Sequence, residues 1–175
     1  MRLKNEAGKE ARLAGLYDEY FDKIARYAYA RIGDRTAAED IAGEVFLKAL
    51  ESLKHYEERG LPMEAWLFKI AHNQVVDHLR ETTKTKTKTV PIETVEIIDK
   101  DDPQTAAETN IEMQRVTLAM KQLTADQAEV IRLRFLSGLS SREVGEMLGK
   151  NDGAVREMQR AAMEKMRKLL NIEEA

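Results

Sequence analysis

The sequence contains no cysteine, which excludes disulfides, thiolate metal sites and cysteine nucleophiles. It also lacks any apolar run near the roughly 20 residues that a membrane-spanning helix requires. The start, MRLKNEAGKEARLAGLYDEY, has no apolar signal core. These absences together predict a protein that works in the reducing cytoplasm and does not insert into a membrane.

Histidine is scarce, and its spacing argues against a catalytic or metal site. A helical hydrolase or metalloprotein would have to use His55, His72, His78 and Asp77. His72 and His78 are separated by roughly 600° around a helix, so they do not share a face as an i, i+4 metal pair does. We therefore expect no enzyme activity, no metal and no cofactor.

The net charge of −3 is a weak argument against a nucleic-acid-binding protein, because such domains are usually basic. The distribution of charge matters more than the total. Within residues 153–168, the acidic side chains are Glu157 and Glu164, and the basic side chains outnumber them. The basic residues are Arg156, Arg160, Lys165, Arg167 and Lys168. Positive charge is thus concentrated on one late helix.

The first part of the chain has the pattern of a helical bundle. Apolar residues recur at spacings of three and four over residues 13–32, which predicts a helix. Gly33 follows directly and is expected to end it. Thr36 and Glu39 form a predicted capping box for a second helix. Its expected inward side chains are Ile41, Val45, Phe46, Ala49, Leu50 and Leu53. A third helix is expected from about Glu64 to Arg80.

Residues 82–101 contain a Thr/Lys alternation without an apolar face to bury before Val90, and we interpret them as a flexible linker. Asp102 and Pro103 then begin another helix as N-cap and first helical residue. The sequence thus predicts an all-α protein of two small helical domains, 1–81 and 102–175.

Residues 139–158, LSSREVGEMLGKNDGAVREM, fit a helix-turn-helix. Gly145 is the small residue that allows the helices to approach, and Gly149 suits the left-handed turn. Lys150 departs from the pattern, because an apolar residue usually follows the glycine. A plain helical hairpin is the alternative. The residues expected to fill the space between the helices are Val144, Leu148, Val155 and Met158.

The helix from Asp152 is then the recognition helix, and its outward side chains face the major groove. Arginine reads guanine, glutamine reads adenine and glutamate reads the cytosine amino group. The alternative for each residue is a solvated charged face. The predicted DNA contacts of this motif are Arg142, Lys150, Asn151, Arg156, Glu157, Gln159 and Arg160, with Arg132 and Arg134 as further candidates for phosphate.

With both halves described, the chain resembles a bacterial sigma factor of the extracytoplasmic-function type. The segment of the family that binds core RNA polymerase is resembled by TAAEDIAGEVFLKAL. The adjoining promoter-melting segment is resembled by AWLFKIAHNQVVDHLR. The stretch from LTADQAEVIRLRF to MRKLL resembles the fourth conserved region, which binds the minus-thirty-five promoter element. The resemblance implies a transcription initiation factor that directs polymerase to specific promoters, with core polymerase and promoter DNA as partners. An anti-sigma factor is a further candidate partner.

The resemblance also implies roles for residues of the first domain. The polymerase contacts would be Asp40, Glu44, Val45, Phe46 and Lys48, although Val45 and Phe46 could simply face the core. The minus-ten and melting contacts would be Lys54, Tyr56, Arg59, Asn73, His78 and Arg80. Among these, Tyr56 can stack on a flipped base, although an ordinary interhelix loop has a similar composition. Trp66 is expected to be a core aromatic rather than a DNA contact.

The main alternative is a helix-turn-helix repressor or activator whose first domain senses a ligand or dimerises. The polymerase-binding resemblance of residues 36–50 argues against it. A repressor normally dimerises to read two half-sites, whereas a sigma factor co-purifies with core polymerase.

Overall fold

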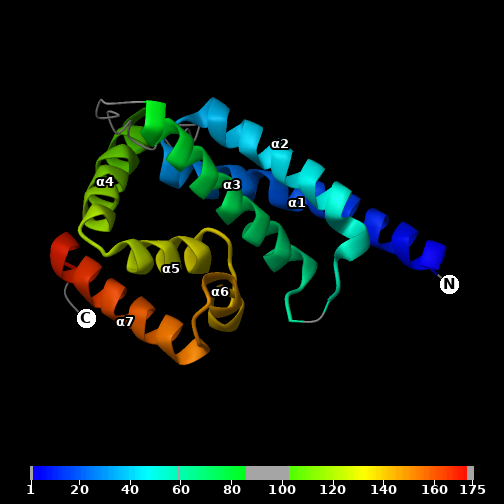
Figure 1. Cartoon of the computed structure of the whole chain (residues 1–175). Helices are drawn as coiled ribbons and strands as arrows, with labels where there is room; N and C mark the ends of the chain where they lie inside the picture. The colour runs from blue at the N-terminus through cyan, green and yellow to red at the C-terminus, as the bar shows by residue number, and fades with distance from the viewer. Residues whose placement is uncertain (1, 59, 86–102, 173–175) are drawn as a thin grey trace. The chain divides into compact units, whose positions relative to one another are not determined.

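The structure is a computed structural model that describes residues 2–58, 60–85 and 103–172, and each element in these ranges is a helix (Figure 1). The predicted all-α class is therefore confirmed. The chain divides into two compact units, Met1–Val90 and Pro91–Ala175, which we call the N-terminal and C-terminal units. The predicted linker lies largely outside the described residues, and its start, up to Thr85, belongs to a helix.

The N-terminal unit consists of α1 (Arg2–Ile32), α2 (Arg35–Ser52), the 3-10 turn η1 (Leu53–His55) and α3 (Met63–Thr85). The three α-helices pack against one another. α1 begins well before the predicted start at residue 13. Its early part is held by Arg12, which donates to Glu58 at 2.7 Å and also pairs with Glu64 of α3. These contacts come from segments distant in the chain, so the periodicity of α1 alone did not predict them.

The predicted capping box of α2 is wrong, because the N-cap is Asp34 rather than Thr36. Gly33 has a φ of 74°, and the chain then becomes extended at Asp34, with φ −120° and ψ 116°. The Asp34 carboxylate accepts a hydrogen bond from the Ala37 backbone N–H at 3.0 Å. Aspartate caps a helix as well as threonine does, so the position of the glycine decided which of the two residues is the cap.

Aromatic side chains lie at the centre of the N-terminal unit. Tyr27 and Phe68 are fully buried, with ring centroids 6.0 Å apart in an edge-on arrangement. Tyr20 also approaches Phe68 edge-on, at 6.2 Å. The Tyr27 hydroxyl is 3.0 Å from His72 Nδ1, so this histidine satisfies a buried tyrosine of the core.

Two leucines of α2 lie outside the core. Leu50 was predicted to face inward but is 53% exposed, and Leu47 is 63% exposed. The inward face of the helix is already filled by Ala38, Ile41, Ala42, Val45, Phe46 and Ala49. At 100° per residue, Leu47 falls opposite the middle of this buried face, and Leu50 falls on its flank, one turn after Phe46. The N-terminal unit therefore presents apolar surface that its own core does not use.

The C-terminal unit consists of α4 (Pro103–Lys121), α5 (Ala125–Phe135), α6 (Ser141–Leu148) and α7 (Asp152–Leu170). Pro103 is the first helical residue as predicted, while its expected cap Asp102 lies outside the described residues. Helices α4, α5 and α6 all pack against α7. One cluster of the core consists of Ala119, Leu123, Ala128, Ile131, Ala162 and Met166.

Both capping boxes predicted for this unit are confirmed. Thr124 and Gln127 exchange side-chain hydrogen bonds at the start of α5, and Ser140 and Glu143 do the same at the start of α6. α5 ends at Phe135, slightly before the predicted end near Gly138, whose φ is 68°. Within the described parts of the chain, no helix is both long enough and apolar enough to cross a membrane.

Candidate nucleic-acid interface

The turn between α6 and α7 has the geometry that a helix-turn-helix requires. Gly149 ends α6 in the left-handed conformation, with φ 65° and ψ 34°. The Lys150 backbone N–H then donates to the Gly145 carbonyl at 2.9 Å. A Cβ added to Gly145 would lie only 2.6 Å from the Lys150 carbonyl oxygen. Gly145 is therefore required by the approach of the turn backbone, as the spacing of the motif predicted.

Apolar and polar contacts fix α7 against α6. Val144 and Val155 are fully buried, and the other two predicted residues, Leu148 and Met158, are half-buried. The Ser141 hydroxyl donates to the Asp152 carboxylate, which joins the first turns of the two helices. These contacts leave α7 little freedom to rotate about its axis, so the outward residues are held in a defined register.

Lys150 and Asn151 have structural partners in the turn. Lys150 forms an ion pair of 2.9 Å with Asp126 at the start of α5, and its side chain is 30% exposed. This pair explains how a lysine occupies a position that is usually apolar, because the stem is covered while the ammonium group is neutralised. The Asn151 Oδ1 accepts from the Ala154 N–H at 2.7 Å and thereby caps α7.

Arg142, Arg156, Glu157 and Arg160 are exposed, as predicted for outward residues. Arg156 forms an ion pair with Asp152 at 2.9 Å, one turn earlier on α7. Such an exposed i, i+4 pair adds at most about 0.5 kcal/mol of stability. Arg156 can therefore leave Asp152 for a DNA base or phosphate at little cost in free energy.

Gln159 differs from the prediction, because its side chain is half-buried rather than directed outward. Its Oε1 accepts a hydrogen bond from Arg134 Nε at 2.8 Å, and Arg134 also donates to the Leu139 carbonyl. Gln159 follows the buried Val155 by one turn, which places it at the edge of the inner face. The pair joins the end of α5 and the loop before α6 to α7.

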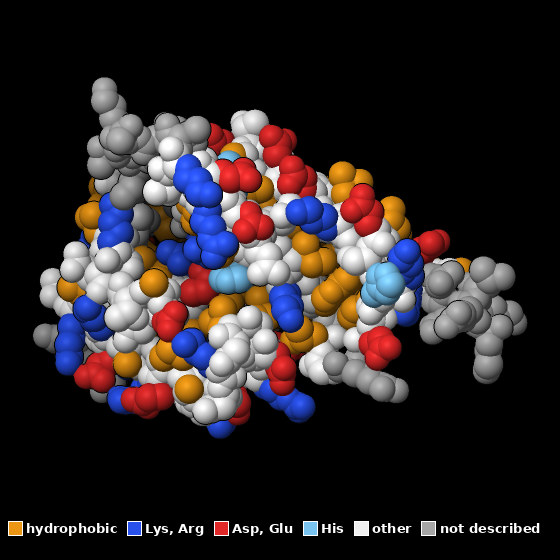
Figure 2. All heavy atoms as spheres, in the orientation of Figure 1, with side chains coloured by type: hydrophobic (Ala, Val, Ile, Leu, Met, Phe, Trp, Pro, Cys, Tyr) orange, Lys and Arg blue, Asp and Glu red, His pale blue; other side chains and the backbone are white. Residues whose placement is uncertain are grey.

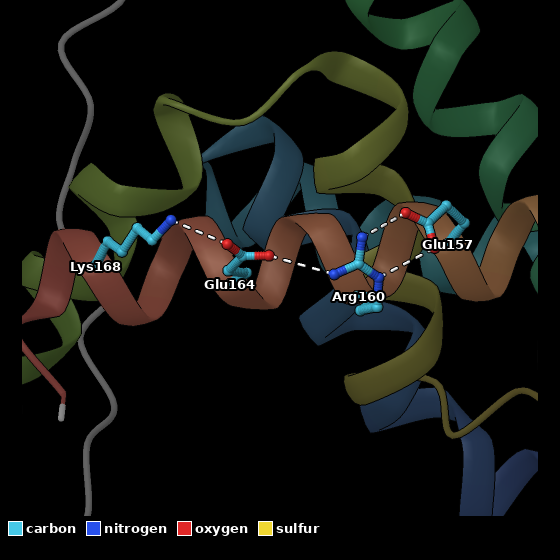
Figure 3. A network of polar contacts seen from close by, with 4 residues as sticks. All are labelled: Glu157, Arg160, Glu164 and Lys168. Atoms are coloured by element: carbon cyan, nitrogen blue, oxygen red, sulfur yellow. Dashed lines mark hydrogen bonds and ion pairs between the residues drawn. The ribbon is translucent and has the colours of Figure 1, made fainter. Parts of the chain in front are cut away.

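A row of alternating charges follows the outer side of α7 (Figure 3). Arg160 donates to both oxygens of Glu157, at 2.7 and 3.1 Å, and to Glu164 at 3.3 Å. Lys168 donates to Glu164 at 2.9 Å. The hydrogen bond to Arg160 lowers the pKa of Glu157, and that from Lys168 lowers the pKa of Glu164. Arg160 is therefore charged and held between two carboxylates.

A shallow groove runs along α7 beside this row, and its lining is rich in basic side chains. The basic residues that line it are Arg134, Arg156, Arg160, Arg167 and Lys168. On the face of the molecule shown in Figure 2, Lys and Arg side chains are interspersed with Asp and Glu. The negative net charge of the chain is therefore not gathered into a single acidic patch on this face.

The residues that the resemblance assigned to polymerase divide into exposed and buried groups. Asp40, Glu44 and Lys48 are exposed on α2. Val45 is fully buried, and Phe46 is 7% exposed with its ring edge-on to Tyr17. For these two apolar residues, the structure favours the alternative of a place in the core.

The buried Gln74 of α3 connects two of the exposed residues. Its Nε2 donates to Glu44 at 2.8 Å, and its Oε1 accepts from Lys48 Nζ at 2.5 Å. Leu47 and Leu50 extend the exposed surface of α2, and our sequence reasoning missed them as candidates. The sequence feature that could have identified them is that α2 contains more apolar residues than one face of a helix can bury.

Tyr56 is buried in the loop between α2 and α3. Its hydroxyl donates to the Leu61 carbonyl at 3.1 Å, and its ring lies 4.7 Å from that of Trp66. Burial raises the pKa of the Tyr56 hydroxyl, with a further contribution from Glu58. Stacking on a flipped base, as predicted, would require the ring to leave Trp66. Trp66 is half-buried, and its ring packs on Tyr56.

The other predicted minus-ten residues are spread over the loop and α3. Lys54, Asn73 and Arg80 are exposed and His78 is half-buried, whereas Arg59 lies outside the described residues. Arg80 is 3.8 Å from Asp77 in a long ion pair. Among the described residues, no three His, Asp or Glu side chains gather in a way that could hold a metal ion.

Comparison with known proteins follows the division into two units. The family model Sigma-70 region 2 matches residues 16–85, and Sigma-70, region 4 matches residues 119–168. Among curated proteins, the ECF RNA polymerase sigma factor BldN of Streptomyces coelicolor is 34% identical over 169 residues, which cover 94% of this chain and 62% of BldN. The ECF sigma factor ShbA of Streptomyces griseus is 33% identical over 153 residues, which cover 82% of this chain and 80% of ShbA.

A solved structure supports the same fold. The sigma factor RpoE of Bartonella quintana, crystallised with the anti-sigma factor NepR, superimposes with a TM-score of 0.67 at 21% identity. The match covers 91% of this chain and 99% of RpoE. With region 2 and region 4 both present, and with relatives matched over most of the chain, the protein belongs to the ECF family of RNA polymerase sigma factors.

Proposed function

We propose that the chain binds core RNA polymerase and directs it to specific promoters. In this proposal the C-terminal unit reads the minus-thirty-five element with α7, while the N-terminal unit binds polymerase and the minus-ten element and promotes melting. The observation that carries the proposal is the α6–α7 turn. Gly145 and Gly149 allow this close turn, and the turn places α7 so that its basic residues are exposed. Sigma factors are initiation factors, and we propose that this chain has no catalytic activity of its own.

The repressor or activator considered above is not favoured. That alternative needs a sensing or dimerisation domain in the first half of the chain, and this half matches Sigma-70 region 2 instead. The decisive experiment is co-purification of the tagged chain with core polymerase, followed by run-off transcription on genomic fragments. We expect promoter-specific transcripts that require both components. A dimer that binds DNA without polymerase and supports no transcription would refute the proposal.

We propose that the polymerase interface lies on the exposed side of α2. Asp40, Glu44 and Lys48 supply charge there, and Leu47 and Leu50 supply apolar surface of the kind enriched at protein interfaces. Val45 and Phe46 support the interface from below, because their burial fixes the helix on which the exposed residues lie. An interface of this type combines apolar contacts with charges that select the partner.

Glu44→Lys is expected to reduce co-purification with core polymerase by at least about tenfold. The change reverses an exposed charge and removes the acceptor for the Gln74 amide N–H. It also places a second ammonium group, beside that of Lys48, near the Gln74 amide. Glu39→Lys on the same helix is the matched control, because Glu39 is exposed and pairs with Arg35. Equal binding of both folded variants would remove Glu44 from the interface.

Arg156→Ala is expected to cost about 1 to 3 kcal/mol of binding at one base pair of the minus-thirty-five element and to relax the preference there. The reason is that Arg156 is exposed on the first turns of α7 and held only by a weak surface pair. Competition binding with single-base variants of the duplex measures this effect. A uniform loss over all sequences would instead make Arg156 a phosphate contact.

The remaining site residues keep the roles proposed from the resemblance. Lys54, Asn73, His78 and Arg80 would contact the minus-ten region, and Arg142, Lys150 and Asn151 the minus-thirty-five region. We further propose that the chain acts in the cytoplasm, where polymerase works. The complex of RpoE with NepR supports an anti-sigma factor as an additional partner.

A further inference from the structure

Arg160 is held by Glu157 in a way that leaves part of its guanidinium unused (Figure 3). Glu157 accepts from Nε at 3.1 Å and from Nη2 at 2.7 Å, which is a bidentate contact with one edge of the group. Glu164 accepts from Nη1 at 3.3 Å. A guanidinium has five N–H donors, so these contacts leave two of them for another acceptor.

Two donors are what a bidentate contact with guanine O6 and N7 requires. The side chains of Arg160 and Glu157 are each 65% exposed, so other groups can reach the pair from outside. An exposed ion pair contributes little to folding. Its larger effect is on binding, because an arginine already held in one conformation loses less side-chain entropy when it meets a base.

The two glutamates would also oppose non-specific binding. Their negative charges lie beside Arg160 and repel the phosphate backbone, which is the main source of sequence-independent affinity. A loosely held arginine in the same place would bind any nearby phosphate. Glu157 is thus suited to favour a base contact over a phosphate contact.

We propose that Glu157 is the positioning residue that directs Arg160 to a guanine of the minus-thirty-five element and so sets the base preference there. The inference rests on the proposed function and deepens it. It departs from the initial prediction that Glu157 reads a cytosine itself. Glu164 differs in role, because it contacts Arg160 through one nitrogen and also accepts from Lys168.

The test uses the full chain bound to core polymerase and a promoter library randomised in the minus-thirty-five element. Wild type is expected to select guanine at one position, and Arg160→Ala is expected to lose that selection. Glu157→Gln should lower the preference at the same position by about two- to fivefold while binding to random DNA increases. Glu157→Asp, which keeps the carboxylate, should retain part of the preference.

Glu164→Gln is the matched control, because it removes the same charge from the same helix. It should increase binding to random DNA and leave the guanine preference unchanged. In an Arg160→Ala background, Glu157→Gln should alter no base preference, since Glu157 acts through Arg160. An unchanged guanine preference in Glu157→Gln, or a changed preference for another base in the double variant, would overturn the inference. If wild type selects no sequence at all, the proposed function itself fails.

Discussion

Gly145→Val is expected to unfold the α6–α7 turn and abolish binding to the minus-thirty-five duplex. The Cβ alone would lie 2.6 Å from the Lys150 carbonyl oxygen, and this oxygen belongs to the backbone. Valine adds two methyl groups with a restricted χ1 in a helix. We expect a loss of about 3 kcal/mol from the C-terminal unit, which is a large share of the stability of so small a domain.

Hydrogen exchange of the α7 amides and duplex binding by the full chain measure this effect. Gly153→Val is the control for stability, because the new Cβ would lie 3.4 Å from Asn151 Oδ1, which is an ordinary van der Waals distance. The unfolding transition seen by Trp66, the single tryptophan of the chain, should not change in either variant. Native exchange rates in Gly145→Val would show that the turn adapts and that the glycine is not required.

Phe68→Ala is expected to lower the free energy of unfolding of the N-terminal unit by about 3 to 5 kcal/mol. Phe68 is fully buried between Tyr20 and Tyr27, and its removal leaves a cavity that two rings and the helices around them cannot readily fill. Most of the unit's stability would be lost, and binding to core polymerase with it.

Urea unfolding followed by Trp66 fluorescence measures the loss, because Trp66 lies on the same helix as Phe68. Phe135→Ala is the matched control. Phe135 is 58% exposed in the C-terminal unit, so its removal should leave the Trp66 transition within about 0.5 kcal/mol of wild type. A similar small change for Phe68→Ala would show that the aromatic cluster is not the centre of this core.

The local signals of the sequence were sufficient wherever one short segment carries all the information. The capping boxes at Thr124 and Ser140, the left-handed Gly149 and the start of α4 at Pro103 each depend on residues within one turn. The cap of α2 was mispredicted because Asp34 and Thr36 both suit the role. The choice depended on where Gly33 ended the preceding helix.

The side-chain partners could not be read from spacing. Gln159 follows the buried Val155 by one turn, but spacing does not show that Arg134 from α5 donates to its side chain. Tyr56 stands in a loop of DNA-binding composition, yet Trp66 and the Leu61 carbonyl bury it. Gln74 joins Glu44 and Lys48 across two helices. Apart from the Tyr56–Leu61 hydrogen bond within one loop, each of these contacts links residues on different elements, whose distance is set only when the helices pack.

The sequence by itself determined the helical class, the two-part organisation and the caps and glycines of the helix-turn-helix, because these follow from local conformational preferences and apolar periodicity. The family resemblance came from its motifs. Only the tertiary structure decided between the core and an exposed contact for Val45 and Phe46, and only it showed that Leu50 is exposed. It also decided how close the turn comes to Gly145 and that Arg134 of α5 reaches Gln159 of α7. Burial and hydrogen-bond partners depend on the neighbours that packing brings together, and a periodicity along one helix contains no record of those neighbours.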